Sequence, residues 1–311
     1  MHADEHPIDV PLVRGLVDAA RPEWAGLPLS PLSRSGSSNA LFRLGEELVV
    51  RLPRQPGGSA TVEKEARWLP WVAPALRVRV PEVVAVGRPG GGYPERWSVL
   101  RWLDGEVPEV DGSGRSGGLD HDALARDLAA VVTALRGLEV PEAARADPAL
   151  RWYRGESLAR QDAGTRANVE ACRDLPGLDL DLDAALSVWE SALDLPDPPG
   201  GRAPSWYHGD LLAENLLVEQ GRLAAVLDFG SLGVGEPTVD LMVAWELLPA
   251  GSRRVFREAT GVDDVSWARG RAWALAVALM TFPYYWRTMP QRCADRLVMA
   301  RAALADASAC T

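Results

Sequence analysis

Three oxygen-bearing side chains in the C-terminal half of the chain have the types and spacing that phosphoryl transfer requires. Asp210 follows His208-Gly209, Asn215 lies five residues later, and Asp228 begins the sequence Asp-Phe-Gly. A carboxylate can accept the proton of an attacking hydroxyl, and kinases place an asparagine five residues after that carboxylate. Amide and carboxylate oxygens are also ligands that Mg²⁺ prefers. The pattern predicts that Asp210 is the catalytic proton acceptor and that Asn215 and Asp228 are metal ligands.

Each part of this pattern is weak by itself, because short motifs recur by chance. The alternative interpretation is a tight turn in which Gly209 turns the chain and Asp210 caps a helix. That interpretation explains each residue singly, but not why Asp228 follows directly after the apolar run 223–227. The combined spacing therefore favours a phosphotransferase.

The chain resembles the aminoglycoside phosphotransferase family, a kinase-like group that also includes choline, homoserine and macrolide kinases. The resemblance is carried by the motif just described and runs from about Ser30 to about Leu304. Protein kinases have arginine where this chain has Gly209, and Ala-Pro-Glu does not follow its Asp-Phe-Gly. Both differences argue against a protein kinase.

The resemblance also implies supporting roles for two residues. The family counterpart of His208 braces the catalytic loop by hydrogen bonds, and the counterpart of Asp240 holds the same loop. The alternative for His208 is an ordinary buried histidine beside a turn. The alternative for Asp240 is an acidic residue favoured in the first turn of a helix.

Binding of the nucleotide phosphates requires a loop and a cation upstream of the motif. A loop that approaches phosphates closely needs little side-chain bulk, and the candidate residues are Gly36, Ser37 and Ser38. Kinases also pair a strand-borne lysine with a helix glutamate. The only lysine, at position 64, lies outside the predicted strands, so the candidate pair is Arg51 with Glu65. The alternative for the loop is an ordinary polar turn. The alternative for Arg51 is an exposed charge on a strand, and that for Glu65 is a position on a solvated helix face.

The nucleotide base would bind to backbone groups, which leave little side-chain signature. By resemblance, these groups lie between the two lobes, at Arg101 and Leu103. ATP is the expected nucleotide, GTP is the alternative, and Mg²⁺ is the expected metal ion.

The acceptor side of the site is the least specified part of the sequence. Aminoglycoside enzymes line this side with carboxylates that meet ammonium groups, although surface charge explains each carboxylate here equally well. The aromatic run 282–286 could stack on a sugar or a macrolactone, although core packing is the favoured explanation. This run weighs against a purely polyamine-like acceptor. The candidate acceptor residues are Glu214, Glu236, Asp263, Asp264, Tyr285 and Trp286.

Composition indicates which binding partners and which cellular compartment to expect. The net charge of −10 disfavours nucleic acid and anionic membranes, and it suits a cationic substrate, although solubility explains it more simply. No apolar run has the length of a membrane span, and the acidic N-terminus does not resemble a signal peptide. Three widely spaced cysteines indicate a reducing compartment. We expect a cytoplasmic protein, a monomer or weak homodimer, that binds a small hydroxyl compound.

The elements that must position these residues change in type along the chain. Strands are concentrated in the first third, and helices follow. The predicted strands are 41–44, 48–52, 81–87 and 97–103; the predicted helices are 8–20, 61–72 with Thr61 as N-cap, 121–137, 154–172, 181–193, 237–248, 252–259, 266–280 and 290–307.

This order predicts an α+β, two-lobed, protein-kinase-like fold. Residues 1–103 would form a small β-sheet lobe with one regulatory-type helix. Residues 104–311 would form a larger, mostly helical lobe with the catalytic loop, the metal site and the acceptor site.

The leading hypothesis is a small-molecule O-phosphotransferase that moves the γ-phosphate of ATP to a hydroxyl of an antibiotic-like acceptor, such as an aminoglycoside. One alternative is a metabolic kinase of the choline, homoserine or sugar type. A second is a non-catalytic, kinase-like nucleotide-binding protein, which would be expected to have lost Asp210, Asn215 or Asp228. All three residues are present.

Overall fold

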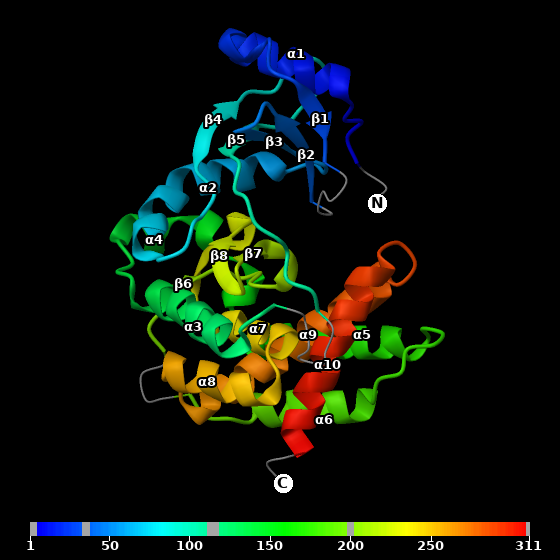
Figure 1. Cartoon of the computed structure of the whole chain (residues 1–311). Coiled ribbons are helices and arrows are strands. Elements are labelled where there is room, and N and C mark those ends of the chain that lie inside the picture. Colours follow the sequence, from blue (N-terminus) through cyan, green and yellow to red (C-terminus); the bar gives the residue numbers. More distant parts are fainter. Residues whose placement is uncertain (1–4, 33–37, 111–117, 198–201, 309–311) are drawn as a thin grey trace. The chain divides into compact units, whose positions relative to one another are not determined.

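The computed structural model describes residues 5–32, 38–110, 118–197 and 202–308 (Figure 1). The chain forms two compact units. The smaller unit contains the residues up to Pro74 together with Arg79–Asp104 and Asp228–Gly230. The larger unit contains Ala75–Val78, Gly105–Leu227 and the residues from Ser231 onward. The Asp-Phe-Gly segment therefore belongs to the N-terminal unit, although the chain on both sides of it belongs to the other.

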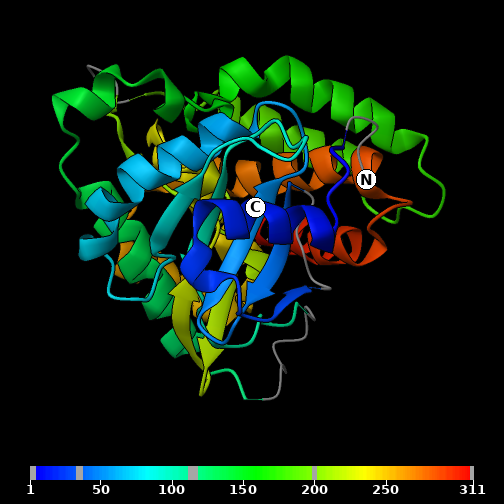
Figure 2. The ribbon, with the colours of Figure 1, turned by 90° about the horizontal axis from the view of Figure 1, so that it is seen from above.

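The smaller unit is built on a five-stranded antiparallel sheet. Its strand order is β1-β2-β3-β5-β4. Val50 and Leu52 pack into a core with helix α1 (Val10–Ala20), which lies across one face of the sheet in Figure 2. Successive side chains of a strand point to opposite faces, so Arg51 points to the other face. The strands are β1 (Leu29–Pro31), β2 (Asn39–Leu44), β3 (Leu48–Pro53), β4 (Val83–Gly87) and β5 (Trp97–Arg101).

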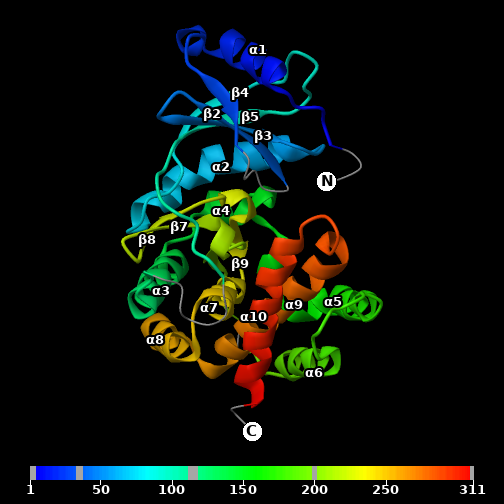
Figure 3. The same cartoon turned by 45° about the vertical axis from the view of Figure 1, so that its right-hand side comes forward.

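Helix α2 (Gly58–Val72) covers the face of the sheet opposite to α1 (Figures 1 and 3). The prediction that Thr61 caps this helix is wrong, because the helix begins three residues earlier and Gly57 is the N-cap residue. The carboxylate of Glu95 accepts hydrogen bonds from the N–H groups of Gly57 and Ser59, both at 2.8 Å. A residue distant in sequence thus satisfies the helix start, which local spacing could not indicate.

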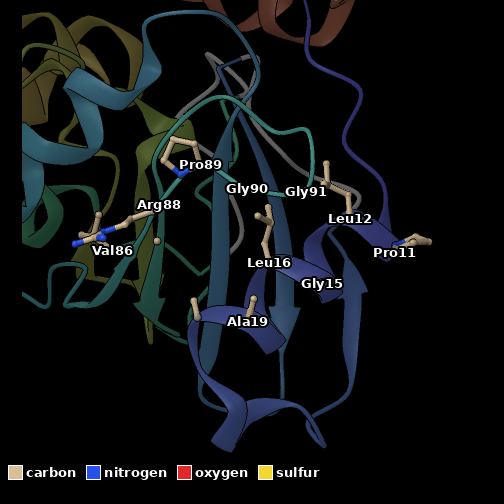
Figure 4. Close-up of a pocket in the computed structure, with 12 residues that line it drawn as sticks. Pro11, Leu12, Gly15, Leu16, Ala19, Val86, Arg88, Pro89, Gly90 and Gly91 are labelled. Atoms are coloured by element: carbon tan, nitrogen blue, oxygen red, sulfur yellow. The ribbon is translucent and has the colours of Figure 1, made fainter.

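The smaller unit also contains a cavity of about 620 Å³ between α1 and the loop that joins β4 to β5. Leu12, Leu16 and Ala19 line it from the helix, and Pro89 and Gly90 line it from the loop (Figure 4). None of the predicted site residues lines this cavity. A second cavity of about 310 Å³, which includes Arg101, lies beside the turn that joins β2 to β3.

Two short antiparallel pairs of strands carry the catalytic segment in the larger unit. Strand β6 (Ser205–Tyr207) pairs with β9 (Gly233–Gly235), and β7 (Leu216–Glu219) pairs with β8 (Arg222–Val226). The β7–β8 turn consists of Gln220 and Gly221, whose φ angles of 50° and 77° fit a type I′ hairpin turn. The hairpin brings Leu227 back to Asn215, whose carbonyl accepts the Leu227 N–H at 2.7 Å.

Helices form the rest of the larger unit. The long helix α9 is apolar on nearly all sides because it packs against α5, α6 and α10 (Figure 3). The helices are α3 (His121–Gly137), α4 (Glu142–Ala146), α5 (Leu158–Arg173), α6 (Leu182–Leu193), α7 (Val243–Leu247), α8 (Ala250–Thr260), α9 (Asp264–Tyr285) and α10 (Pro290–Ser308).

Two predicted helices begin differently from the sequence interpretation. The segment predicted as helix 237–248 starts as a 3₁₀-helix, η7 (Pro237–Met242), before α7. The segment predicted as helix 154–172 contains a separate 3₁₀ turn, η4 (Tyr153–Gly155), before α5. This turn places Arg154 beside the catalytic loop, as shown below.

Candidate active site

The catalytic loop makes a sharp turn at Gly209 directly after β6. Gly209 has a φ of 84°, which side chains disfavour, and an added Cβ would lie 2.7 Å from the carbonyl oxygen of Ser231. A residue with a side chain does not fit here without movement of the backbone. The turn thus explains physically why this chain has glycine before its catalytic aspartate.

Asp240, on η7, binds the start of this loop. Its carboxylate oxygens accept hydrogen bonds from the backbone N–H groups of His208 and Gly209, both at 2.7 Å. Asp240 is buried, and burial raises the pKa of its carboxyl above the ordinary value, although His208 and the two N–H groups oppose the rise. These contacts are what a loop-holding residue would make.

His208 joins the loop to the end of β8. Its Nε2 lies 2.9 Å from the carbonyl oxygen of Leu227, and its Nδ1 accepts the backbone N–H of Asp210 at 3.2 Å. Because Nδ1 accepts a hydrogen bond, Nε2 carries the proton and donates it to the carbonyl. The imidazole is fully buried and serves these backbone contacts.

Asp210 and Asn215 are in direct contact. The Nδ2 group of Asn215 donates to the carbonyl oxygen of Asp210 at 2.8 Å and to its Oδ2 at 3.0 Å. The amide nitrogen therefore faces Asp210, which leaves the amide oxygen as the group that a cation would meet.

Arg154 also binds Asp210, a contact that no motif in the sequence predicted. Its guanidinium donates to Oδ1 of Asp210 and, at 2.7 Å, to the carbonyl oxygen of Gly209. Its Nε donates to the hydroxyl of Tyr153 at 2.9 Å. No motif marks this arginine, which lies more than fifty residues before the loop. The closest sign is its place after two aromatic residues in a segment predicted as helix.

The ion pair sets the charge of Asp210. Burial would raise the pKa of this carboxyl, but Arg154, with smaller contributions from Arg296 and His208, lowers it below the ordinary value. Asp210 is thus ionised at neutral pH. Its side chain is 25% exposed, against 13% for Arg154, so the carboxylate is fixed but still accessible.

In the smaller unit, Arg51 and Glu65 form a buried ion pair. The guanidinium donates from NH1 to Oε1 of Glu65 at 3.1 Å and from NH2 to Oε2, so the pair is bidentate. The Nε of Arg51 lies 3.4 Å from the hydroxyl of Ser98, its neighbour on β5. This is the pair that the sequence analysis predicted between the strand and the helix.

The Asp-Phe-Gly segment is bound by two cations of the same unit. The NH1 group of Arg51 lies 3.9 Å from Oδ1 of Asp228, and Nζ of Lys64 donates to the carbonyl oxygen of Gly230 at 2.6 Å. Asp228 has a φ of 52°, a left-handed conformation that is uncommon for a residue other than glycine and is often found at functional sites. Its side chain is 42% exposed, so its carboxylate is accessible to a ligand.

The structure says less about the other residues that were predicted to bind the nucleotide. Gly36 and Ser37 lie outside the described residues, and Ser38 is exposed, with its carbonyl bound to the N–H of Arg54 at 2.9 Å. The Arg101 side chain binds Glu82 at 3.0 Å on the surface. Leu103 follows β5 and is half-buried.

Three of the four predicted acceptor carboxylates form ion pairs with arginines. Glu214 binds Arg292 at 3.0 Å and Arg296 at 3.1 Å. Asp263 is the N-cap of α9, where it accepts the N–H of Ser266 at 2.6 Å, and it also pairs with Arg202 at 3.1 Å; Asp264 pairs with Arg257. Glu236 is half-buried, and its burial raises the pKa of its carboxyl. Only Glu214 belongs to the catalytic loop.

The two predicted aromatic residues differ in their surroundings. The guanidinium of Arg292 lies 5.1 Å from the ring centre of Tyr285, which links this tyrosine to Glu214. Trp286 packs edge-on against buried Phe282 and donates from Nε1 to the carbonyl of Pro176 at 3.2 Å. Tyr285 is therefore on the catalytic-loop side, while Trp286 has contacts typical of packing.

The donor set at the predicted metal site is hard and oxygen-rich, which fits Mg²⁺. Within the ranges that the structure describes, no group of three or more His, Cys, Asp or Glu side chains could hold a metal ion. Asn215 and Asp228 would be two ligands only, and Mg²⁺ sites of this kind are completed by phosphates and water.

This geometry and fold define a phosphotransferase, an enzyme whose phosphoryl acceptor is an alcohol group. The chain belongs to the phosphotransferase enzyme family, whose family model matches residues 29–273. The resemblance inferred from the motif is thereby confirmed. A comparison with curated protein sequences gave no significant match. None of the described helices is long and apolar enough to cross a membrane.

Solved structures share the fold over nearly the whole chain. The GDP complex of wild-type aminoglycoside 2′-phosphotransferase-IIIa has 20% identity and a TM-score of 0.70, covering 96% of this chain and 100% of that one. The streptomycin–ATP–APH(2″)-IIa ternary complex has 18% identity and a TM-score of 0.63, with coverages of 96% and 99%. Apo macrolide 2′-phosphotransferase MphH from Brachybacterium faecium has 25% identity and a TM-score of 0.62, with coverages of 95% and 98%. The predicted α+β kinase-like fold is confirmed.

Proposed function

We propose that the protein transfers the γ-phosphate of ATP to a hydroxyl group of an antibiotic-like small molecule. The observation that carries this proposal is the carboxylate of Asp210, fixed by Arg154 and Asn215 yet still accessible. The similar solved structures support it, because they include a GDP complex and a streptomycin–ATP complex of aminoglycoside phosphotransferases and a macrolide 2′-phosphotransferase. GTP is the alternative nucleotide.

Asp210 would align the acceptor hydroxyl and take its proton. The ionised state that Arg154 maintains suits an acceptor of hydrogen bonds more than a strong base. This fits phosphoryl transfer, where positioning and electrostatics contribute most of the catalysis. Asp240 and His208 would hold the loop that carries Asp210.

The amide oxygen of Asn215 and the carboxylate of Asp228 would hold Mg²⁺, which when bound neutralises charge on the nucleotide phosphates. Arg51, oriented by Glu65, would contact the same phosphates, together with the loop at Gly36, Ser37 and Ser38. Lys64 would hold the Asp-Phe-Gly backbone through the Gly230 carbonyl.

Backbone groups between Arg101 and Leu103 would bind the base, and the lobes would be residues 1–103 and 104–311. Cys172 and Cys293 are free and buried, as expected in the cytoplasm. We expect a monomer or weak homodimer that binds neither nucleic acid nor membrane.

The test is Asp210→Asn, assayed for transfer of labelled γ-phosphate to a panel of hydroxylated antibiotics, choline, homoserine and sugars. We expect turnover to fall by about 10²–10⁴-fold while Mg-nucleotide binding is retained. Asp174→Asn, an exposed carboxylate on the same unit, is the matched control and should have wild-type activity. Unchanged turnover in Asp210→Asn would sink the proposal.

The same panel separates the alternatives. Transfer only to choline, homoserine or a sugar would identify a metabolic kinase. Nucleotide binding without transfer to any acceptor and without hydrolysis of the nucleotide would identify a non-catalytic binding protein.

A further inference from the structure

The second carboxylate of the catalytic loop, Glu214, is already bound by cations. Oε1 of Glu214 accepts from Arg292 at 3.0 Å and from Arg296 at 3.1 Å. Both arginines are on α10, and Arg296 is close enough to Asp210 to lower the pKa of its carboxyl. A cationic acceptor would therefore meet two guanidinium groups where it needs a free carboxylate.

The carboxylates behind this position are engaged as well. Glu246 is buried, accepts the Ala213 N–H at 2.6 Å and forms an ion pair with Arg296. Asp295, which is half-buried, accepts from Gln291 at 2.9 Å. Three carboxylates (Glu214, Glu246 and Asp295) thus lie beside two arginines of α10 (Arg292 and Arg296), while Arg154 is paired with Asp210. Glu214 and Glu246 therefore already have guanidinium partners, and a polyamine would compete with these arginines for them.

Aromatic side chains lie beside the same cations. Tyr153 accepts from Arg154 at 2.9 Å, and its ring lies 5.1 Å from that of Trp152. The hydroxyl of Tyr153 lies 3.6 Å from the sulfur of Met280 on α9, one helical turn before Tyr284. Trp152 is 43% exposed and Tyr284 is 56% exposed, so one aromatic ring faces solvent two residues before Arg154 and another faces solvent beside Tyr285.

Tyr285 continues this aromatic surface. Its ring lies 4.6 Å from that of Tyr284, and its other neighbour is the guanidinium of Arg292. Exposed apolar patches of this kind mark binding sites, and tyrosine and tryptophan rings stack on flat apolar ligands.

We propose that the phosphoryl acceptor is an uncharged or anionic alcohol with a large apolar surface, and that a polycationic aminoglycoside is not accepted. This inference rests on the proposed function, because it takes the acceptor to approach Asp210. A polyamine at Glu214 would compete with Arg292 and Arg296 for the same carboxylate, and the two guanidinium groups would repel its ammonium groups. An apolar alcohol keeps these ion pairs intact and covers the aromatic surface.

The experiment compares erythronolide B, a polyhydroxylated macrolactone without an amine, with kanamycin A, a polyamine. Binding of each to the full-length protein with Mg²⁺ and a non-hydrolysable ATP analogue is measured by calorimetry. We expect the macrolactone to bind at least about tenfold more tightly. Kanamycin binding as tight or tighter would overturn the inference, and so would a failure of the macrolactone to bind.

Two variants identify the surface responsible. Tyr284→Ala should weaken macrolactone binding by about tenfold, whereas Trp71→Ala, at another exposed aromatic residue in the other unit, should not. Arg292→Gln removes one of the two guanidinium groups that bind Glu214 and should strengthen kanamycin binding. Arg254→Gln, at an exposed position of α8, should have no effect. Equal effects in a variant and its control would contradict the assignment.

Nucleotide binding is measured separately, so that the two proposals fail differently. Macrolactone binding without any nucleotide binding would contradict the proposed function and support the acceptor surface. Transfer of phosphate to kanamycin in preference to the macrolactone would support the proposed function and overturn this inference.

Discussion

The guanidinium of Arg154 binds the carboxylate of Asp210 and the carbonyl oxygen of Gly209, so one side chain fixes both the charge and the backbone of the catalytic loop. This contact joins a 3₁₀ turn to a loop more than fifty residues away in sequence. Removal of the cation should therefore change the titration of Asp210 and not only its position.

Arg154→Gln tests this relationship through pH. Without the cation, burial dominates and raises the pKa of Asp210, so the carboxylate is protonated at higher pH. We expect the acidic limb of the kcat/KM profile to move to higher pH. Exposed Arg160→Gln is the control. An acidic limb at the same pH in Arg154→Gln would show that Arg154 has no electrostatic role.

Arg51→Met separates stability from nucleotide binding. Glu65 would remain buried without its partner, which costs about 3–5 kcal/mol in the free energy of unfolding. The double variant Arg51→Met with Glu65→Gln should recover most of this stability in urea denaturation. Both variants should have a raised KM for ATP, and a wild-type KM in the stable double variant would exclude Arg51 as the phosphate cation.

Lys64→Met removes the donor to the Gly230 carbonyl. A hydrogen bond from a charged group contributes about 1.5–3 kcal/mol, so Asp228 should be less well fixed in its left-handed conformation. We expect weaker Mg-nucleotide binding by calorimetry, by about tenfold or more. Lys64→Arg keeps a hydrogen-bond donor and should retain part of the affinity for Mg-nucleotide. An equal loss of affinity in both variants would argue against a positioning role for Lys64.

Glu246→Gln tests the buried carboxylate under the loop. Burial raises the pKa of Glu246 to about 7, although the charge of Arg296 opposes the rise. A carboxyl whose folded-state pKa is raised binds its proton more tightly in the folded protein, so its contribution is favourable below pH 4.5 and is lost as pH rises to about 7. The free energy of unfolding should fall by on the order of 3 kcal/mol over this pH range.

The measurement for Glu246 is the pH dependence of unfolding. The wild-type protein should show this loss of stability between pH 5 and about 7, and Glu246→Gln should lack it. Exposed Glu258→Gln should keep the wild-type slope. An unchanged slope in Glu246→Gln would mean that this carboxyl does not titrate in that range.

The sequence by itself identified the phosphotransferase family, the fold class and most of the helices and strands. Local patterns suffice for these, because alternation, helical period and motif spacing act between residues close in the chain. Asp210 and Asn215 were predicted from a five-residue step, and the structure shows them in direct contact. The roles of the predicted site residues stay predictions until the variants are measured.

Only the tertiary structure decided which distant groups surround these residues. Arg154 at Asp210, Glu95 at the start of α2 and Arg292 with Arg296 at Glu214 are all contacts between segments far apart in sequence. No periodicity or motif encodes such a pair, because its partners meet only when complete helices and strands pack. For the same reason, the spacing of the motif determined the reaction, whereas the charge around the acceptor depended on how the helices of the larger unit fold against the loop.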